Sequence, residues 1–331
     1  MHIIITLIIL VVVITIGLVS LYRHDFATDP MRWGVTFSAP YARDELHLDW
    51  RETYLAILDD LQVRELRLSA YWNEIEKTPG VYQFADLDWQ INEAATRGAG
   101  ITLAVGRRLP RWPECHAPGW VGSLDRDEQR AAQLSYVRTV VERYQRNPAI
   151  TQWQIENEPY LDTFGICPPL DRELFMEEIA LVRELSDKPI LITDSGELST
   201  WLPAARSGGD ALGTTMYRVV HNEQVGYFSW PLPPAFYALK ARAVKRFTGV
   251  PNVIIAELQA EPWPSQNQTL RDLPLTETDK SFSIQQFQSN LSYAQRTGLD
   301  ETYLWGAEWW YLMKKQEKSE AFWEEAKKLW Q

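Results

Sequence analysis

The chain lacks the residue patterns that would bind nucleic acid, a metal ion or a phosphate group. It has 33 Lys and Arg against 44 Asp and Glu, a net charge of -11, and contains no basic run. This balance argues against nucleic acid and against an anionic membrane surface as partners. The only cysteines, Cys115 and Cys167, are too few for a disulfide framework, and their spacing matches no zinc motif. We therefore expect no metal and no cofactor.

Charge is also missing from the first part of the chain. Residues 3–22 carry no charged side chain, and about 20 apolar residues are enough to cross a bilayer. A cleavable signal peptide is the alternative, but it needs a basic start and a small-x-small cleavage site. The chain starts Met1-His2, and Gly17-Leu18-Val19-Ser20 is a poor cleavage site. We predict an uncleaved membrane anchor and short stalk over residues 1–30, followed by one domain over residues 31–331.

The rest of the chain alternates short apolar segments with segments of helical periodicity. The predicted strands cover residues 33–37, 65–68, 101–105, 148–158, 189–193, 212–216, 253–256 and 302–305. Helices are predicted from Asp49, around Trp89, and over residues 127–145, 171–186, 235–247, 283–296 and 319–330. Eight such units in about 300 residues predict an α/β fold of the (β/α)8 TIM-barrel type. An open doubly wound sheet is the alternative, but no Gly-rich phosphate loop follows the first strand.

Two glutamates stand at the predicted carboxyl ends of barrel strands. Glu158 ends the fourth strand, because Pro159 cannot donate a ladder hydrogen bond, and Glu257 ends the seventh. Catalytic groups lie at this end of a barrel, and the fourth and seventh strands face each other across it. A carboxyl pair of this kind suits glycoside hydrolysis. Glu261 is a rival to Glu257, but it lies further past the strand.

The residues around these glutamates resemble a known group of enzymes. Ile155-Glu156-Asn157-Glu158-Pro159 and Ile255-Ala256-Glu257 are similar to the acid/base and nucleophile strands of clan A glycoside hydrolases, which are retaining β-glycosidases. The segment from Leu66-Arg67-Leu68 through Tyr71-Trp72-Asn73-Glu74 to Pro79-Gly80-Val81-Tyr82 resembles the family 42-like β-galactosidases of this clan. The resemblance covers residues 32 to 312.

The resemblance implies a role for several side chains. Glu158 would be the acid/base, Glu257 the nucleophile, and Asn157 a partner of the sugar 2-hydroxyl group. Arg67 would orient Glu257, and Tyr217 would lie beside it. The sequence has 15 Trp and 14 Tyr, and such rings stack on sugars. Trp305 would form the floor of the sugar site, and further wall candidates are Trp72, Trp112, Trp120, Glu308 and Trp309.

We therefore expect a retaining β-glycosidase whose partner is a glycoside, an oligosaccharide or a polysaccharide. A barrel that binds carbohydrate without turnover is the alternative, although both glutamates are intact. A barrel aldolase would need a strand-end lysine or a metal cluster, and the sequence offers neither. The sugar, and whether cleavage is exo or endo, stay open.

Location and cysteine pairing follow from this function. Such substrates are met outside the cell, so we place the domain there, although Arg23 after the anchor favours the cytoplasmic side under the positive-inside rule. Cys115 and Cys167 fall on the loops after the third and fourth strands, which are neighbours in a barrel. An oxidising compartment would permit a bond between them, and the sequence leaves open whether it forms.

Overall fold

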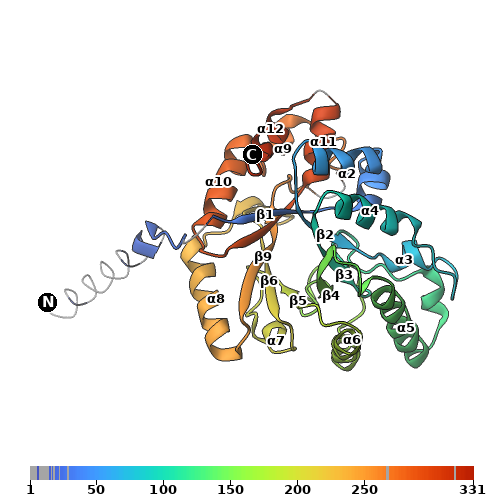
Figure 1. Cartoon of the computed structure of the whole chain (residues 1–331). Coiled ribbons are helices and arrows are strands. Elements are labelled where there is room, and N and C mark those ends of the chain that lie inside the picture. Colours follow the sequence, from blue (N-terminus) through green and yellow to red (C-terminus); the bar gives the residue numbers. More distant parts are fainter. Residues whose placement is uncertain are drawn as a thin grey trace.

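The computed structural model describes residues 6, 15, 17, 19–21, 23–27, 30–265, 268–316 and 318–331. Its centre is a closed barrel of eight parallel strands surrounded by helices (Figure 1). The strands are β1 (Arg32–Thr36), β2 (Glu65–Ser69), β3 (Gly100–Val105), β4 (Ile150–Ile155), β5 (Ile190–Asp194), β6 (Ala211–Met216), β9 (Asn252–Gln259) and β10 (Glu301–Trp305).

The barrel closes because β1 pairs in parallel with both β10 and β2. Around the barrel the order is β1, β2, β3, β4, β5, β6, β9 and β10. The strands are buried on both faces, as expected for a parallel sheet covered by helices. The predicted (β/α)8 fold is confirmed.

Helices cover the outside of the barrel, and several begin where the sequence predicts. The side chain of Asp49 accepts hydrogen bonds from the amides of Arg51 and Glu52, and Asp125 forms a capping box with Glu128. The main helices are α2 (Trp50–Asp59), α4 (Ala85–Thr96), α5 (Arg126–Tyr144), α6 (Arg172–Leu185), α8 (Pro234–Thr248), α10 (Ile284–Gln295) and α12 (Ala321–Lys327).

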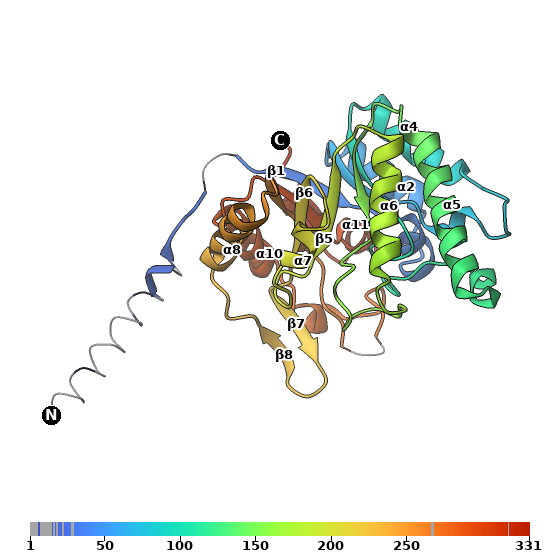
Figure 2. The ribbon, with the colours of Figure 1, turned by 90° about the horizontal axis from the view of Figure 1, so that it is seen from below.

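Other elements were not predicted. A hairpin of β7 (Val219–Asn222) and β8 (Gly226–Ser229) follows β6 and projects away from the barrel (Figure 2). Helix α11 (Ala307–Lys315) follows β10 and contains Glu308 and Trp309, two of the predicted wall residues. Short helical turns fill the loops: η1 (Tyr41–Glu45), α3 (Trp72–Ile75), η2 (Gly119–Ser123), α7 (Leu202–Ala205) and α9 (Leu275–Thr278).

Strand β4 ends earlier than predicted. The ladder stops at Ile155, and the backbone then turns through Glu156 and Glu158, whose φ angles are 56° and 44°. This left-handed conformation is uncommon for residues other than glycine. It ends the strand before Pro159 is reached, so the proline is not what terminates it. The turn leaves Glu158 at the carboxyl end of the barrel, which we call its mouth.

The two cysteines form a disulfide, which settles the pairing that the sequence leaves open. The bond joins Cys115 and Cys167, whose Cα atoms lie 5.3 Å apart. It links the loop after β3 to the loop after β4. The amide of Ile166 also donates to the carbonyl of Pro113 at 2.9 Å. Two neighbouring loops at the mouth are therefore fixed to each other.

The predicted membrane anchor falls mostly outside the described residues. Of residues 3–22, the structure describes only residues 6, 15, 17 and 19–21. Among the residues that are described, no helix is both long and apolar enough to cross a bilayer. The anchor stays a prediction from the sequence.

Candidate active site

A buried arginine stands at the centre of the barrel mouth. Arg67 lies on β2, is fully buried, and points into the barrel. Its Nη1 donates to Oε1 of Glu257 at 2.8 Å, its Nη2 to Oδ1 of Asn157 at 2.7 Å, and its Nε to Oε1 of Gln154 at 2.7 Å. Arg67 therefore connects the two strands that carry the predicted catalytic residues, and it lies where the resemblance implies.

Glu257 is held on both carboxylate oxygens. It lies within β9 and is 3% exposed. Besides the bond from Arg67, its Oε2 accepts a hydrogen bond from the hydroxyl of Tyr217 at 2.8 Å. Burial, and then the charge of Glu257, raise the pKa of Tyr217 well above its usual value. The tyrosine thus remains a proton donor to the carboxylate, and its expected position beside Glu257 is confirmed.

Glu158 has a different environment. Its backbone amide donates to Oγ1 of Thr193 at 2.8 Å, and its Oε1 accepts a hydrogen bond from Oγ1 of Thr215 at 3.3 Å. Burial raises the pKa of Glu158 well above its usual value, and the charges of Glu257 and Glu114 raise it further. Glu158 therefore keeps its proton to higher pH, as a general acid requires.

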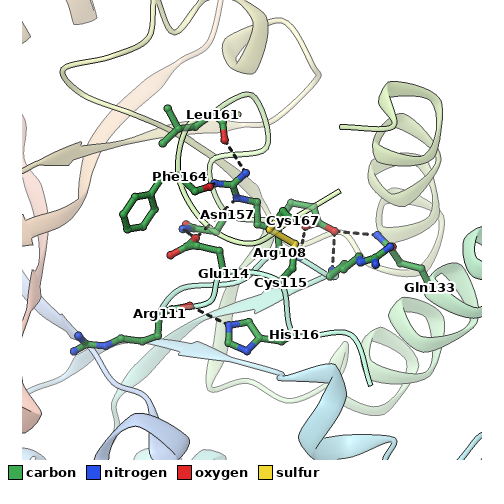
Figure 3. Close-up of a disulfide and its surroundings, with 12 residues drawn as sticks. Arg108, Arg111, Glu114, Cys115, His116, Gln133, Asn157, Leu161, Phe164 and Cys167 are labelled. Carbon is green, nitrogen blue, oxygen red and sulfur yellow. Dashed lines mark hydrogen bonds and ion pairs between the residues drawn. A yellow bond between two sulfur atoms is a disulfide. The ribbon is translucent and has the colours of Figure 1, made fainter. Parts of the chain in front are cut away.

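A third carboxyl group, which the sequence analysis did not identify, completes this cluster. Glu114 lies in the β3 loop and accepts a hydrogen bond from Nδ2 of Asn157 on its Oε2 at 3.0 Å (Figure 3). Burial, and then the charge of Glu257, raise the pKa of Glu114 to about 8. Residues in loops lack the periodicity that locates residues on strands and helices. The position of Glu114 next to Cys115 is therefore the only feature of the sequence that could have pointed to it.

Another ionic cluster lies at the same mouth. The guanidinium of Arg111 pairs with Glu261 and, at 3.0 Å, with Oε2 of Glu308. It lies between two rings, 3.8 Å from the centroid of Tyr41 and 4.2 Å from that of Trp305. One face of Trp305, the predicted floor of the sugar site, is thus covered by a cation. Arg111 was not predicted, and Glu308 serves as its partner.

Two of the remaining wall candidates, Trp72 and Trp309, pack away from the site. Trp72 is fully buried, stacks on Tyr136 at 5.2 Å and donates to Glu76, so it packs the helices together. Trp309 is fully buried in the hydrophobic core, with its ring against Phe322. Their assignment to the pocket wall is wrong, since large apolar rings next to strand ends also fill the layer between barrel and helices.

Two further tryptophans complete the list of wall candidates. Trp120 is partly buried, and its indole nitrogen donates to the backbone of Glu76, which places it beside Trp72. Trp112 is 63% exposed at the rim, where its ring centroid lies 5.8 Å from that of Phe164. In the described part of the chain, no group of three or more His, Cys, Asp or Glu could hold a metal ion.

Comparison with known proteins supports the fold. The sequence matches no protein-family model and no curated protein. The structure resembles a family 10 endo-β-1,4-xylanase from Gloeophyllum trabeum at 15% identity, with a TM-score of 0.55 and coverage of 86% of this chain and 87% of that one. It also resembles GH5_18 from Streptomyces cattleya, solved in complex with GlcNAc, at 12% identity and a TM-score of 0.58, covering 84% and 70% of the chains.

A β-galactosidase from Marinomonas ef1 is a third neighbour, at 15% identity and a TM-score of 0.53, covering 83% of this chain and 54% of that one. All three neighbours are glycoside hydrolases. At these identities the likeness establishes the shared barrel fold, and the residue roles must be argued from the site.

The raised pKa of Glu114 predicts how stability depends on pH. Between its usual value and about 8, the folded protein keeps a proton that the unfolded chain releases, so this group makes stability fall as pH rises through that window. Glu114→Gln removes the titration and can still accept from Asn157. At each pH we take the melting temperature of the variant minus that of the unmodified protein. We expect this difference to increase by about 2 °C or more from pH 5 to pH 8.

The control is Glu184→Gln on the exposed side of α6, for which the difference should not change with pH. A Glu114→Gln difference that is equally flat would show that Glu114 does not titrate in this window.

Proposed function

We propose that the protein is a retaining β-glycosidase in which Glu158 is the acid/base and Glu257 the nucleophile. The observation that carries this proposal is the contrast between two buried carboxyl groups that lie three strands apart around one barrel. Glu257 is paired with the cation of Arg67 and the hydroxyl of Tyr217. Burial and neighbouring negative charge raise the pKa of Glu158. Contrasting environments of this kind assign one group as acid and the other as nucleophile.

The first step follows from these contacts. The carboxylate of Glu257 attacks the anomeric carbon while Glu158 gives its proton to the oxygen of the leaving group, and the bond between that carbon and oxygen breaks. Arg67 and Tyr217 hold Glu257 in place for the attack. Asn157 has two N–H donors on its amide, and Glu114 accepts from one. The second is then left for a sugar hydroxyl.

The second step uses the change of charge that the first produces. Once Glu257 is esterified it carries no charge, and its effect on the pKa of Glu158 is removed. Glu158, now a carboxylate, takes a proton from water, whose oxygen attacks the anomeric carbon and releases Glu257. The electrostatic coupling between the two glutamates therefore favours the acid in one step and the base in the next.

Substitution of the pair tests the proposal. Glu257→Ala should abolish hydrolysis of aryl β-glycosides, and azide should restore turnover by entering the empty nucleophile site and yielding a glycosyl azide of inverted configuration. Glu158→Ala should lower turnover of substrates with poor leaving groups by about 10²–10⁴-fold. With good leaving groups its first step should be spared, and hydrolysis of the intermediate should be slow.

The matched control is Glu184→Ala, an exposed glutamate on the outer helix α6, which should keep full activity. Full activity of Glu257→Ala would refute its role. Binding of the sugars without any turnover by the unmodified protein would favour the non-catalytic carbohydrate-binding barrel instead.

We also propose that the domain works outside the cytoplasm, held by the uncharged segment over residues 3–22. The disulfide between Cys115 and Cys167 supports this location, because such bonds persist in oxidising compartments. Full-length protein should stay with the membrane after a carbonate wash, and added protease should reach the domain in intact cells. Recovery of soluble protein that begins beyond residue 22 would instead identify a cleaved signal peptide.

A further inference from the structure

Loops from opposite sides of the barrel meet across its mouth. In the closed order of strands, β3 and β9 are four positions apart in either direction, so they are diametrically opposed. Arg111 in the β3 loop nevertheless pairs with Glu261, two residues past the end of β9. The ion pair therefore spans the mouth, and the contact of Arg111 with Glu308 extends it toward β10.

A row of aromatic rings also extends across the mouth, from the β3 loop to the β9 loop. The ring centroid of Trp112, next to Arg111, lies 5.8 Å from that of Phe164 in the β4 loop. Phe164 lies 6.2 Å from Trp263 in the β9 loop, and Trp263 lies 5.3 Å from Tyr217, the partner of Glu257. We call Arg111, Trp112, Phe164, Glu261 and Trp263 together the mouth bridge.

The mouth bridge is anchored at its β3 and β4 end. The disulfide fixes the two loops to each other, and the guanidinium of Arg108 donates to the carbonyls of Leu161 and Phe164 at 2.7 and 2.8 Å (Figure 3). The backbone of Arg111 has a φ angle of 84°, a strained conformation that persists only where the surroundings impose it. The bridge is therefore a built feature of the site.

Buried polar atoms of the bridge are left without partners. Among the described residues, Nε of Arg111 and Oε2 of Glu261 have no hydrogen bond of good geometry, although the two residues are only 5% and 7% exposed and the indole of Trp305 lies close to the Glu261 carboxyl. Buried polar groups are nearly always satisfied, so these atoms indicate where ligand hydroxyl groups would bind. The ring of Trp263, two residues after Glu261, lies 5.3 Å from that of Tyr217, the partner of Glu257, so this part of the bridge lies beside the proposed nucleophile.

The strand order fixes which end of a substrate the bridge would meet. Glu158, which would protonate the leaving oxygen, follows β4, and β4 lies diametrically opposite β10. Arg111 lies on the β10 side, between Tyr41 from the β1 loop and Trp305 at the end of β10. The leaving group therefore lies toward β4, and the far end of the sugar points toward Arg111, where buried side chains fill the mouth.

We infer that Arg111 and Glu261, at the end of the mouth bridge away from β4, close the site beyond a single sugar, so that the enzyme is exo-acting and releases one terminal residue whose remote hydroxyl groups bind these two side chains. This inference rests on the proposed glycosidase function. Exo action would distinguish the chain from its family 10 neighbour, which is an endo-β-1,4-xylanase. An endo enzyme needs a cleft open at both ends, and here the glycone end is occupied.

Product analysis is the first test. The full-length protein is given β-1,4-linked tetrasaccharides of xylose, glucose and mannose, each labelled at the reducing end. We expect the first products to be an unlabelled monosaccharide and a labelled trisaccharide. Labelled disaccharide among the first products would show internal cleavage and overturn the inference.

Binding gives a second test that does not need turnover. In the Glu257→Gln variant, we compare the affinity for cellotetraose with that for the same sugar whose terminal 4- and 6-hydroxyl groups are blocked as an ethylidene acetal. Blocking should weaken binding at least tenfold, because it removes hydroxyl donors and adds bulk at Arg111. Equal affinities would refute the closed end. Tight binding of the free-ended sugar without hydrolysis by the unmodified protein would instead refute only the proposed function.

Variants of the mouth bridge test whether Arg111 and Glu261 cause the difference in affinity between the free and the blocked sugar. In the same Glu257→Gln background, Glu261→Gln keeps the size of the side chain and Arg111→Ala opens the mouth; each should reduce the discrimination between free and blocked sugar to less than threefold. The matched control is Arg97→Ala, an arginine on α4's carboxyl end that likewise pairs with two carboxylates, Asp59 and Glu93. Unchanged discrimination in folded Glu261→Gln, as in the control, would overturn the assignment.

Discussion

The burial of one positive charge in the centre of the barrel is the constraint on which the site depends. Arg67 has no exposed surface and binds Glu257, Asn157 and Gln154. A buried cation is stable only with good geometry and full hydrogen bonding, and loss of one partner of such a pair typically costs about 3–5 kcal/mol. The charge therefore fixes the positions of the side chains around it. Because those side chains come from β4, the turn that follows it and β9, folding of the barrel and assembly of the site are one event.

Around this cation the protein buries more carboxyl groups than it has cations to pair with them. The mouth holds Glu114, Glu158, Glu257, Glu261 and Glu308. Their partners are Arg67 and Arg111, with Arg108 3.9 Å from Glu114. Burial and mutual repulsion raise the pKa of Glu158 well above its usual value and that of Glu114 to about 8. Glu114 and Glu158 thus stay protonated, which avoids an excess of negative charge at the mouth. The proton on Glu158 is the one that the proposed first step transfers to the leaving group.

Local sequence patterns predict the framework well and the mouth only in part. Strand periodicity places the third strand at residues 101–105, and β3 covers Gly100–Val105. Glu257, Arg67 and Tyr217 lie together as the resemblance implies, because β9 and β2 carry the first two and Tyr217 directly follows β6. The end of β4 is missed, since no pattern announces the left-handed backbone at Glu156 and Glu158. Arg111 and Glu114 are missed because they belong to a loop whose path depends on the disulfide and on contacts across the barrel. Trp72 and Trp309 are misassigned because a buried ring and a sugar-stacking ring look the same in sequence.

The central claim is that Glu158 and Glu257 act as acid and nucleophile in a double displacement, and the stereochemistry of the product tests it most directly. A proton NMR time course of β-glycoside hydrolysis follows the anomeric signals before mutarotation mixes them. Two displacements at the anomeric carbon invert it twice, so the account predicts that the β-anomer of the released sugar appears first and the α-anomer grows in later. Initial release of the α-anomer would mean a single displacement by water, and would contradict the assignment of Glu257 as nucleophile.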